Sequence, residues 1–125
     1  MRPTPYLFVY GTLKKGSRVP ERLPLDAKAH LLREVTLRAK LYHLDEYPGA
    51  VLSSDEKDVV HGELYELKET EATLAELDAY EGGEFERKLV DVFFPEFGFP
   101  LECWAYLYVG PTAGLTLVPG GRFLV

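Results

Sequence analysis

An apolar run near the N-terminus, at residues 5–10, constrains the fold more than any other feature of the sequence. In an extended strand its three aromatic side chains point to one face, and Leu7 and Val9 point to the other. A strand that is apolar on both faces is stable only when other elements cover both faces. We therefore predict a central, buried strand with a hydrophobic layer on each side.

Alternating apolar and polar residues predict several further strands. These strands lie at residues 35–42, 50–52, 59–67, 89–94 and 101–109. The turn-rich segment 95–100 is expected to join the last two strands as a hairpin. Tyr47-Pro48-Gly49 is expected to interrupt the strand pattern between the first two strands.

The clearest helix begins at Thr70, which can cap its N-terminus, and ends at about Glu81, before Gly82-Gly83. A short helix is also expected near residues 27–33. Many strands with one long helix indicate an α+β architecture rather than a doubly wound sheet.

Length, charge and cysteine content limit the class of protein. The 125 residues suit a single domain spanning residues 1–125. A formal net charge of −6 repels phosphate backbones and anionic lipid surfaces, so we expect neither a nucleic acid nor a membrane as a partner. The single cysteine, Cys103, excludes an internal disulfide. It suits a reducing compartment, and the first apolar run is too short for a signal peptide or a spanning helix, so we expect a cytoplasmic protein.

The segment YGTLKKGS, which follows the first strand, resembles a phosphate-binding loop at first sight. A nucleotide-hydrolase loop needs Gly, four residues and then Gly-Lys-Ser/Thr. Here Ser17 occupies the lysine position and Arg18 the hydroxyl position, which argues against that interpretation. Two explanations are left: a turn with exposed lysines, or a tight corner at residues 11–13 whose backbone N–H groups bind a carboxylate or carbonyl oxygen.

One carboxylate of the long helix is predicted to face the core. Leu74 and Leu77 form the apolar stripe of this helix, and Glu81 lies four residues beyond Leu77 on the same stripe. Burial would raise the pKa of such a glutamate more than the helix dipole would, as a general base near neutral pH requires. A structural ion pair with Arg87 or Lys88 would explain the same pattern.

Other reactive side chains give weaker signals. His30, His43 and His61 lack the spacing of metal ligands, so surface or strand positions explain them better. Cys103 lies inside a predicted strand, where a buried, inert thiol is expected. The tyrosines of the strands are numerous enough to line a pocket, although such residues usually pack in the core.

Two separated segments together resemble one family. FVYGTLxxG at residues 8–16, and LDxYEG at residues 77–82 followed by F-x-R, are similar to the gamma-glutamylcyclotransferase-like family. Supporting matches lie at residues 41–42, 47–49, 62–65 and 104–106, so the resemblance covers nearly the whole chain in the right order. The sequence departs from the family at Phe85, where tyrosine is common, and at Ala39, where glycine is common.

The resemblance implies a small closed or nearly closed mixed β-barrel with one main helix and a cavity at one end. It also implies a loop that binds the glutamyl group through backbone donors, with Glu81 as the catalytic acid/base. The residues of this loop are Tyr10, Gly11, Thr12 and Leu13. Tyr106 is a further candidate for substrate contact because of its position. The resemblance implies no metal and no cofactor.

The implied reaction is an intramolecular acyl transfer, in which the α-amine of a γ-glutamyl group attacks its own γ-carbonyl. It forms 5-oxoproline and releases an amine or an amino acid. Two other functions are compatible with the residues: a non-catalytic module that binds a small molecule in the same cavity, and a phosphate or nucleotide binder.

Overall fold

The computed structural model describes residues 4–10, 29–44, 48–81, 85–94 and 100–121. Of the predicted turn at residues 95–100, residues 95–99 lie outside these ranges, and so does the predicted helix stop at Gly82-Gly83. In chain order the elements are β1 (Tyr6–Val9), β2 (Ala29–His43), β3 (Pro48–Leu52), β4 (Val59–Leu67), α2 (Thr70–Glu81), β5 (Phe85–Phe93), β6 (Pro100–Tyr108), β7 (Thr116–Leu117) and a 3-10 turn, η1 (Pro119–Gly121).

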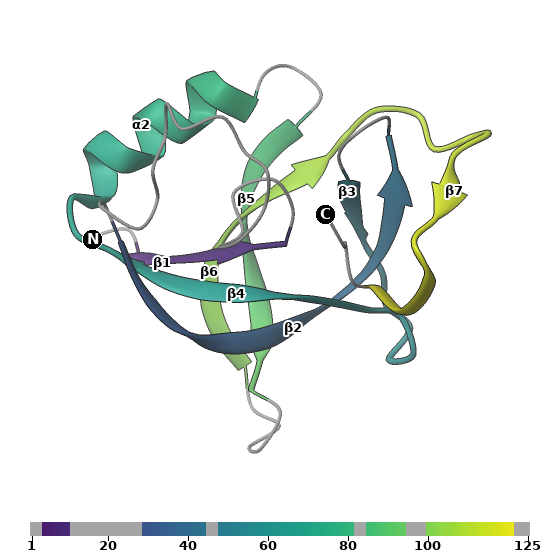
Figure 1. Cartoon of the computed structure of the whole chain (residues 1–125), viewed down its shortest axis with the longest axis horizontal. Helices are drawn as coiled ribbons and strands as arrows, with labels where there is room; N and C mark the ends of the chain where they lie inside the picture. Colours follow the sequence, from purple (N-terminus) through teal and green to yellow (C-terminus); the bar gives the residue numbers. More distant parts are fainter. Residues whose placement is uncertain (1–3, 11–28, 45–47, 82–84, 95–99, 122–125) are drawn as a thin grey trace.

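Five strands close into a barrel in the order β2-β4-β1-β6-β5, and β5 pairs back to β2. The closure joins Thr36 to Phe93 and Leu37 to Val92. Strands β1 and β6 are parallel and the other neighbours are antiparallel, so the barrel is mixed. Figure 1 shows α2 along one side of this barrel, with β3 and β7 beside the last part of β2 on the other side. The predicted α+β barrel with one main helix is confirmed.

Strand β2 is long because its two parts pair with different strands. Its residues from Ala29 to Arg38 pair with β4, and its last residues pair with β3 and β7. The expectation of a short helix at residues 27–33 is therefore wrong for the described residues from Ala29 onward. Backbone pairing, such as Ala29 with Leu67, outweighs the weak local helix preference of this segment.

Strand β3 begins earlier than the sequence suggests. Pro48 and Gly49, which were expected to break the chain, are the first two residues of the strand and pair with His43 and Tyr42. Proline is tolerated at the first position of a strand because its missing N–H is not needed there. The predicted strand at residues 50–52 is confirmed and is separate from β2 as expected, but it begins at Pro48 rather than after Gly49.

The two faces of β1 lie in two different hydrophobic clusters. Phe8 and Tyr10 belong to the cluster inside the barrel, whereas Leu7 and Val9 belong to the cluster beneath helix α2. All four side chains are buried. The predicted central strand, covered on both faces, is confirmed.

Helix α2 spans the predicted residues and covers β1 with the predicted face. Leu74 and Leu77 are buried in the cluster beneath it, and Thr73 is buried with them. The N–H group of Thr73 donates to the carbonyl oxygen of Glu69 at 2.9 Å. The N-cap is thus Glu69, one residue before the predicted Thr70.

Two adjacent glycines close the described part of the chain in left-handed conformations. Gly120 has a φ of 71° and Gly121 a φ of 66°. A Cβ atom on Gly120 would meet nothing within 4 Å, but one on Gly121 would overlap the carbonyl oxygen of Val59, in the first residue of β4. The positive φ angle favours glycine at both positions, but only at Gly121 is there also no room for a Cβ atom.

Alanine substitution at these two positions should separate the two effects. Gly120→Ala should lower the free energy of unfolding by about 1–2 kcal/mol, the usual cost of a left-handed residue with a Cβ. Gly121→Ala should lower the free energy of unfolding by the same amount and by about 1–3 kcal/mol in addition, because the turn must move away from β4. Urea unfolding of both variants measures the difference, and equal losses would contradict the close contact.

Candidate active site

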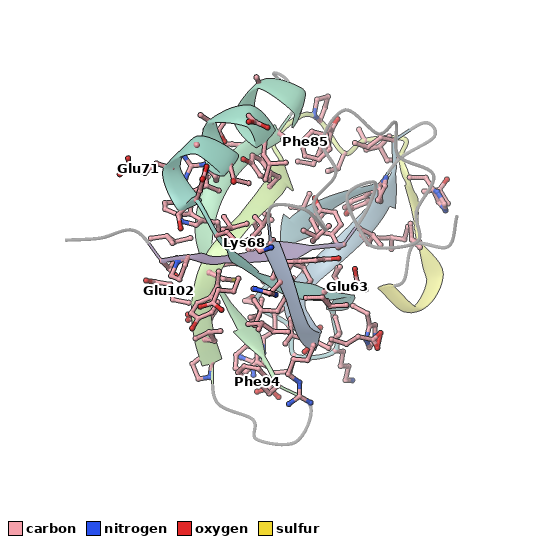
Figure 2. All side chains as sticks on the ribbon, turned by 60° about the vertical axis from the view of Figure 1, so that its left-hand side comes forward. Glu63, Lys68, Glu71, Phe85, Phe94 and Glu102 are labelled. Carbon is pink, nitrogen blue, oxygen red and sulfur yellow. The ribbon has the colours of Figure 1, made fainter. Side chains whose placement is uncertain are left out.

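The elements that carry the predicted site residues meet at one end of the barrel. Strands β1 and β6 are parallel, so their C-terminal ends point the same way. Phe85, the first residue of β5, pairs with Tyr108, the last residue of β6. Helix α2 ends at Glu81, four residues before Phe85. Figure 2 shows Phe85 close to the helix and Phe94 at the opposite end of the barrel.

The structure describes the predicted site in part. Residues 11–13 of the predicted loop lie outside the described residues, and so does the side chain of Glu81. The backbone places Glu81 as the last residue of α2, and Tyr10 and Tyr106 are described completely. The roles of the loop and of Glu81 therefore stay predictions.

The hydroxyl group of Tyr10 connects two strands that do not pair with each other. It donates to the carbonyl oxygen of Tyr106, on β6, at 2.5 Å. It also accepts a hydrogen bond of 3.1 Å from the N–H group of Ala50, on β3. Only 6% of Tyr10 is exposed, so this hydroxyl is a buried cross-link at the point where the chain leaves β1.

The side chain of Tyr106 points to helix α2. Its ring lies in the cluster beneath the helix, and its hydroxyl is 2.6 Å from Oδ1 of Asp78 and 3.3 Å from the carbonyl oxygen of Leu74. A hydroxyl has one proton, and the shorter distance assigns it to the carboxylate. The suggested contact of Tyr106 with substrate stays a prediction, whereas its contact with the helix is observed.

Asp78 and Arg87 form an ion pair that sequence reasoning did not identify. Nε and Nη2 of Arg87 donate to the two carboxylate oxygens of Asp78 at 2.9 and 3.2 Å. The guanidinium of Arg87 also lies 4.4 Å from the centre of the Trp104 ring. Spacing could have drawn attention to Asp78, which lies four residues after Leu74 and so borders the apolar stripe, but not to its partner on β5.

Two opposing effects act on the pKa of Asp78. Partial burial raises it, but hydrogen bonds from Arg87 and Tyr106, together with the positive charge of Arg87, hold it below its ordinary value. Asp78 is therefore an ionised anchor at neutral pH rather than an acid or base for catalysis.

Phe85, the departure from the family pattern, packs against an aromatic neighbour. Its ring and the ring of Tyr108 meet edge to face, with their centres 6.0 Å apart. The hydroxyl of Tyr108 donates to the carbonyl oxygen of Pro111 at 2.9 Å. Aromatic packing is thus kept at this position without the hydroxyl group that a tyrosine would add.

The thiol of Cys103 is buried inside the barrel, as predicted. Burial, followed by the charges of Asp91 and Glu102, raises its pKa to about 12. The group is therefore a protonated, unreactive thiol at neutral pH.

The described residues hold neither a candidate metal site nor a membrane-spanning helix. They contain no group of three or more His, Cys, Asp or Glu side chains that could hold a metal ion. No helix within the described ranges is long and apolar enough to span a membrane.

A small mixed barrel with a helix against its first strand is also the fold of a solved AIG2-like protein from Mus musculus, with a TM-score of 0.67 at 23% identity, covering 85% of this chain and 78% of that chain. The family model described as "Gamma-glutamyl cyclotransferase, AIG2-like" matches residues 7–125. The chain belongs to this family. Its membership indicates an enzyme of the gamma-glutamylcyclotransferase type, as the sequence predicts.

Relatives in enterobacteria match nearly the whole chain. The gamma-glutamylcyclotransferase family protein ytfP of Citrobacter rodentium is 37% identical over 121 residues, which cover 94% of each chain. The protein of the same name from Escherichia coli K12 is 36% identical over 121 residues, covering 94% of this chain and 95% of the relative. The solution NMR structure of ytfP from Escherichia coli aligns with a TM-score of 0.65 at 38% identity, covering 95% of this chain and 96% of that chain.

Replacing Tyr10 with phenylalanine should destabilise the protein. The substitution leaves the carbonyl oxygen of Tyr106 and the N–H group of Ala50 without the hydroxyl between them, so the free energy of unfolding should fall by about 1–3 kcal/mol. Tyr6→Phe is the control, because Tyr6 lies in β1, the strand that Tyr10 follows, and packs against the same cluster. No hydrogen bond of its hydroxyl is found among the described residues. Urea unfolding should show a loss below about 0.5 kcal/mol for this control. Equal losses in the two variants would contradict the cross-link.

The Asp78–Arg87 pair should make stability depend on pH in the acid range. The pKa of Asp78 is lower in the folded state than in the unfolded state, where it is about 3.9. Its charge therefore stabilises the fold fully above about pH 4. That contribution is lost as the pH falls through the lower, folded value. Wild type should be more stable than Asp78→Asn in urea unfolding at pH 7, with the difference shrinking steadily below pH 4. A difference that does not change with pH would contradict this account.

Proposed function

We propose that the protein converts a γ-glutamyl amine or a γ-glutamyl amino acid to 5-oxoproline and a free amine. The observation that carries this proposal is the family match over residues 7–125, combined with a glutamate at the end of helix α2, which covers β1. The match gives the reaction class, and the position of Glu81 gives a residue for it.

The proposed reaction needs one proton acceptor and one proton donor. The α-amine of the substrate forms a bond to the γ-carbonyl carbon, and the bond from this carbon to the leaving nitrogen breaks. The attacking nitrogen loses a proton and the leaving nitrogen gains one, so atoms and charges balance without water. One carboxyl group can take the first proton and deliver the second.

Glu81 is the residue that we assign to both proton transfers. It lies four residues after Leu77 and seven after Leu74, and both leucines are buried beneath the helix. This spacing predicts the same helix face for Glu81 as for the two leucines. Asp78, the other acid in this turn, is already committed to Arg87 and Tyr106.

The loop that follows β1 is proposed to hold the substrate. Tyr10, the residue at its start, is hydrogen-bonded to β6 and β3 through its hydroxyl group. The position from which the loop would extend is therefore fixed. Backbone N–H groups at residues 11–13 would hold the glutamyl carboxylate or the oxyanion that develops on the γ-carbonyl. Because the nucleophile and the carbonyl belong to one molecule, holding the substrate folded would supply much of the rate.

The test is the release of 5-oxoproline from a panel of γ-glutamyl amines and γ-glutamyl amino acids. Wild type should release it, and Glu81→Gln should lower kcat/KM by about 10²–10⁴-fold, the range for loss of a general acid/base. Glu76→Gln is the control, since Glu76 lies on the exposed side of the same helix and its loss removes the same charge. It should keep activity close to that of wild type.

Two results would count against the proposal. Undiminished turnover by Glu81→Gln would refute the role of this glutamate. A γ-glutamyl compound that raises the melting temperature but is recovered unchanged would instead favour a non-catalytic binding module.

A further inference from the structure

We propose that strand β5 is an interface through which two copies of this chain pair edge to edge, about a two-fold axis at Leu89. The two β5 strands would form an antiparallel ladder, so that the sheets of the two copies become continuous. Three features of β5 support this pairing: a free edge, an exposed leucine at its centre, and an order of charges that is complementary to itself. The pairing is independent of the proposed reaction.

The first feature is the free edge of β5. One side of the strand pairs with β6 over all nine of its residues. On the other side only Val92 and Phe93 pair, with Leu37 and Thr36 of β2. No strand among the described residues pairs with residues 85–91 on that side. An unpaired edge of this kind is a template for pairing with another chain.

The register of β2 shows which backbone groups of β5 point to the free edge. Strand β4 occupies one edge of β2, so β3 and β5 share the other. The carbonyl oxygen of Arg38 points to this shared edge, because it accepts a hydrogen bond of 3.1 Å from the N–H group of Ser53, next to β3. Thr36, two residues earlier, therefore directs its backbone groups to β5, and its partner Phe93 directs its own to β2.

Backbone groups alternate along a strand, so Arg87, Leu89 and Asp91 direct their N–H and C=O groups to the free edge. The intervening residues, Lys88 and Val90, direct theirs to β6. In an antiparallel ladder about Leu89, each of the three outward-directed residues would form a hydrogen-bonded pair with a residue of the second copy. This register therefore uses the free backbone groups without disturbing the ladder to β6.

The second feature is Leu89, the middle residue of β5. It is 47% exposed, and the residue opposite it on β6 is the half-buried Trp104. In the proposed ladder Leu89 would lie directly opposite Leu89 of the second copy, on the face that also carries Trp104. Apolar cross-strand pairs stabilise a sheet, so the interface would cover a leucine that the single chain leaves in water.

The third feature is the order of charges on that face of β5, where Arg87 and Asp91 lie at equal distances on either side of Leu89. Antiparallel pairing about Leu89 places Arg87 of each copy opposite Asp91 of the other. Asp91 makes no hydrogen bond or ion pair with the described residues, and it faces Glu102 directly across β6. Like charges in opposite positions are unfavourable, so a guanidinium group from the second copy would relieve this repulsion.

Arg87 can take part without giving up its contact with helix α2. Its Nε and Nη2 atoms donate to Asp78. A guanidinium group has five N–H donors, and those of Nη1 can serve a second carboxylate. The side chain of Arg87 is 27% exposed, so it is accessible from the surface.

Two other features limit the strength of this dimer. The formal net charge of −6 repels a second copy, and exposed Lys88 would lie diagonally across the axis from its own counterpart on the opposite face. Only a few residues of each copy would meet, which is typical of weak complexes that bury less than about 1,200 Å². We therefore expect a reversible dimer that forms at high protein concentration.

The first test compares Leu89→Lys with Leu117→Lys by sedimentation velocity over a series of protein concentrations. Leu117 is 50% exposed on β7, so both variants replace a similarly exposed strand leucine and add the same charge. Leu89→Lys brings two ammonium groups together on the axis, and it should raise the dimer Kd by at least about tenfold. Leu117→Lys should stay within about twofold of wild type. Equal Kd values for the two variants would overturn the proposal.

The second test examines the register by comparing Asp91→Arg with Glu102→Arg. Both variants turn the Asp91–Glu102 pair into one of opposite charge, and both change the net charge equally. Only Asp91→Arg places a guanidinium group opposite Arg87 of the second copy. It should raise the dimer Kd by at least about tenfold although the net charge becomes less negative, whereas Glu102→Arg should not raise it. Equal Kd values here would refute this register.

Amide hydrogen exchange of the wild type, followed residue by residue by NMR, gives a readout without substitutions. The N–H groups of Arg87, Leu89 and Asp91 should exchange about tenfold more slowly when about 90% of the chains are paired, because exchange then proceeds through the unpaired fraction. Those of Lys88 and Val90, already in the ladder to β6, should not depend on concentration in this way. A dimer without this alternation would indicate another surface, and a chain that stays monomeric throughout the series would overturn the proposal.

Discussion

The structure depends on one constraint, which is that β1 has no polar face. Phe8 and Tyr10 fill the barrel interior, and Leu7 and Val9 lie beneath α2, so neither layer can be removed without exposing apolar surface. Burial of one such aliphatic or aromatic side chain is favourable by about 1.5–3 kcal/mol. The barrel closes around one face and the helix covers the other. This arrangement also brings the end of β1 and the end of the helix to the same end of the barrel.

Burial holds the layers together, but directional contacts set the geometry where those ends meet. The side chains of Asp78 and Arg87 are 43% and 27% exposed, so their ion pair adds little stability. Its two hydrogen bonds, and the third from Tyr106, instead fix the orientation of one carboxylate. The hydroxyl of Tyr10 has a similar role for β3 and β6, which share no ladder.

Sequence-based predictions succeed where periodicity decides and fail where a distant partner decides. The strand at residues 59–67 and the helix from Thr70 to Glu81 have the predicted bounds, because their apolar spacing is determined by which face is buried. Residues from Ala29 onward pair with β4 instead of forming the expected short helix, and Pro48 enters β3 instead of breaking it. Arg87 was considered as a partner for Glu81, and its observed partner is Asp78.

The sequence by itself determined the fold class, the doubly buried first strand, the helix and the family, because each follows from local apolar spacing or from motifs along the chain. It also selected Glu81 and the loop after Tyr10 as the proposed site. Only the tertiary structure decided how the elements that carry them are connected. Tyr106 reaches Tyr10 across 96 residues and Asp78 across 28, and contacts over such separations depend on strand register and helix docking rather than on local spacing.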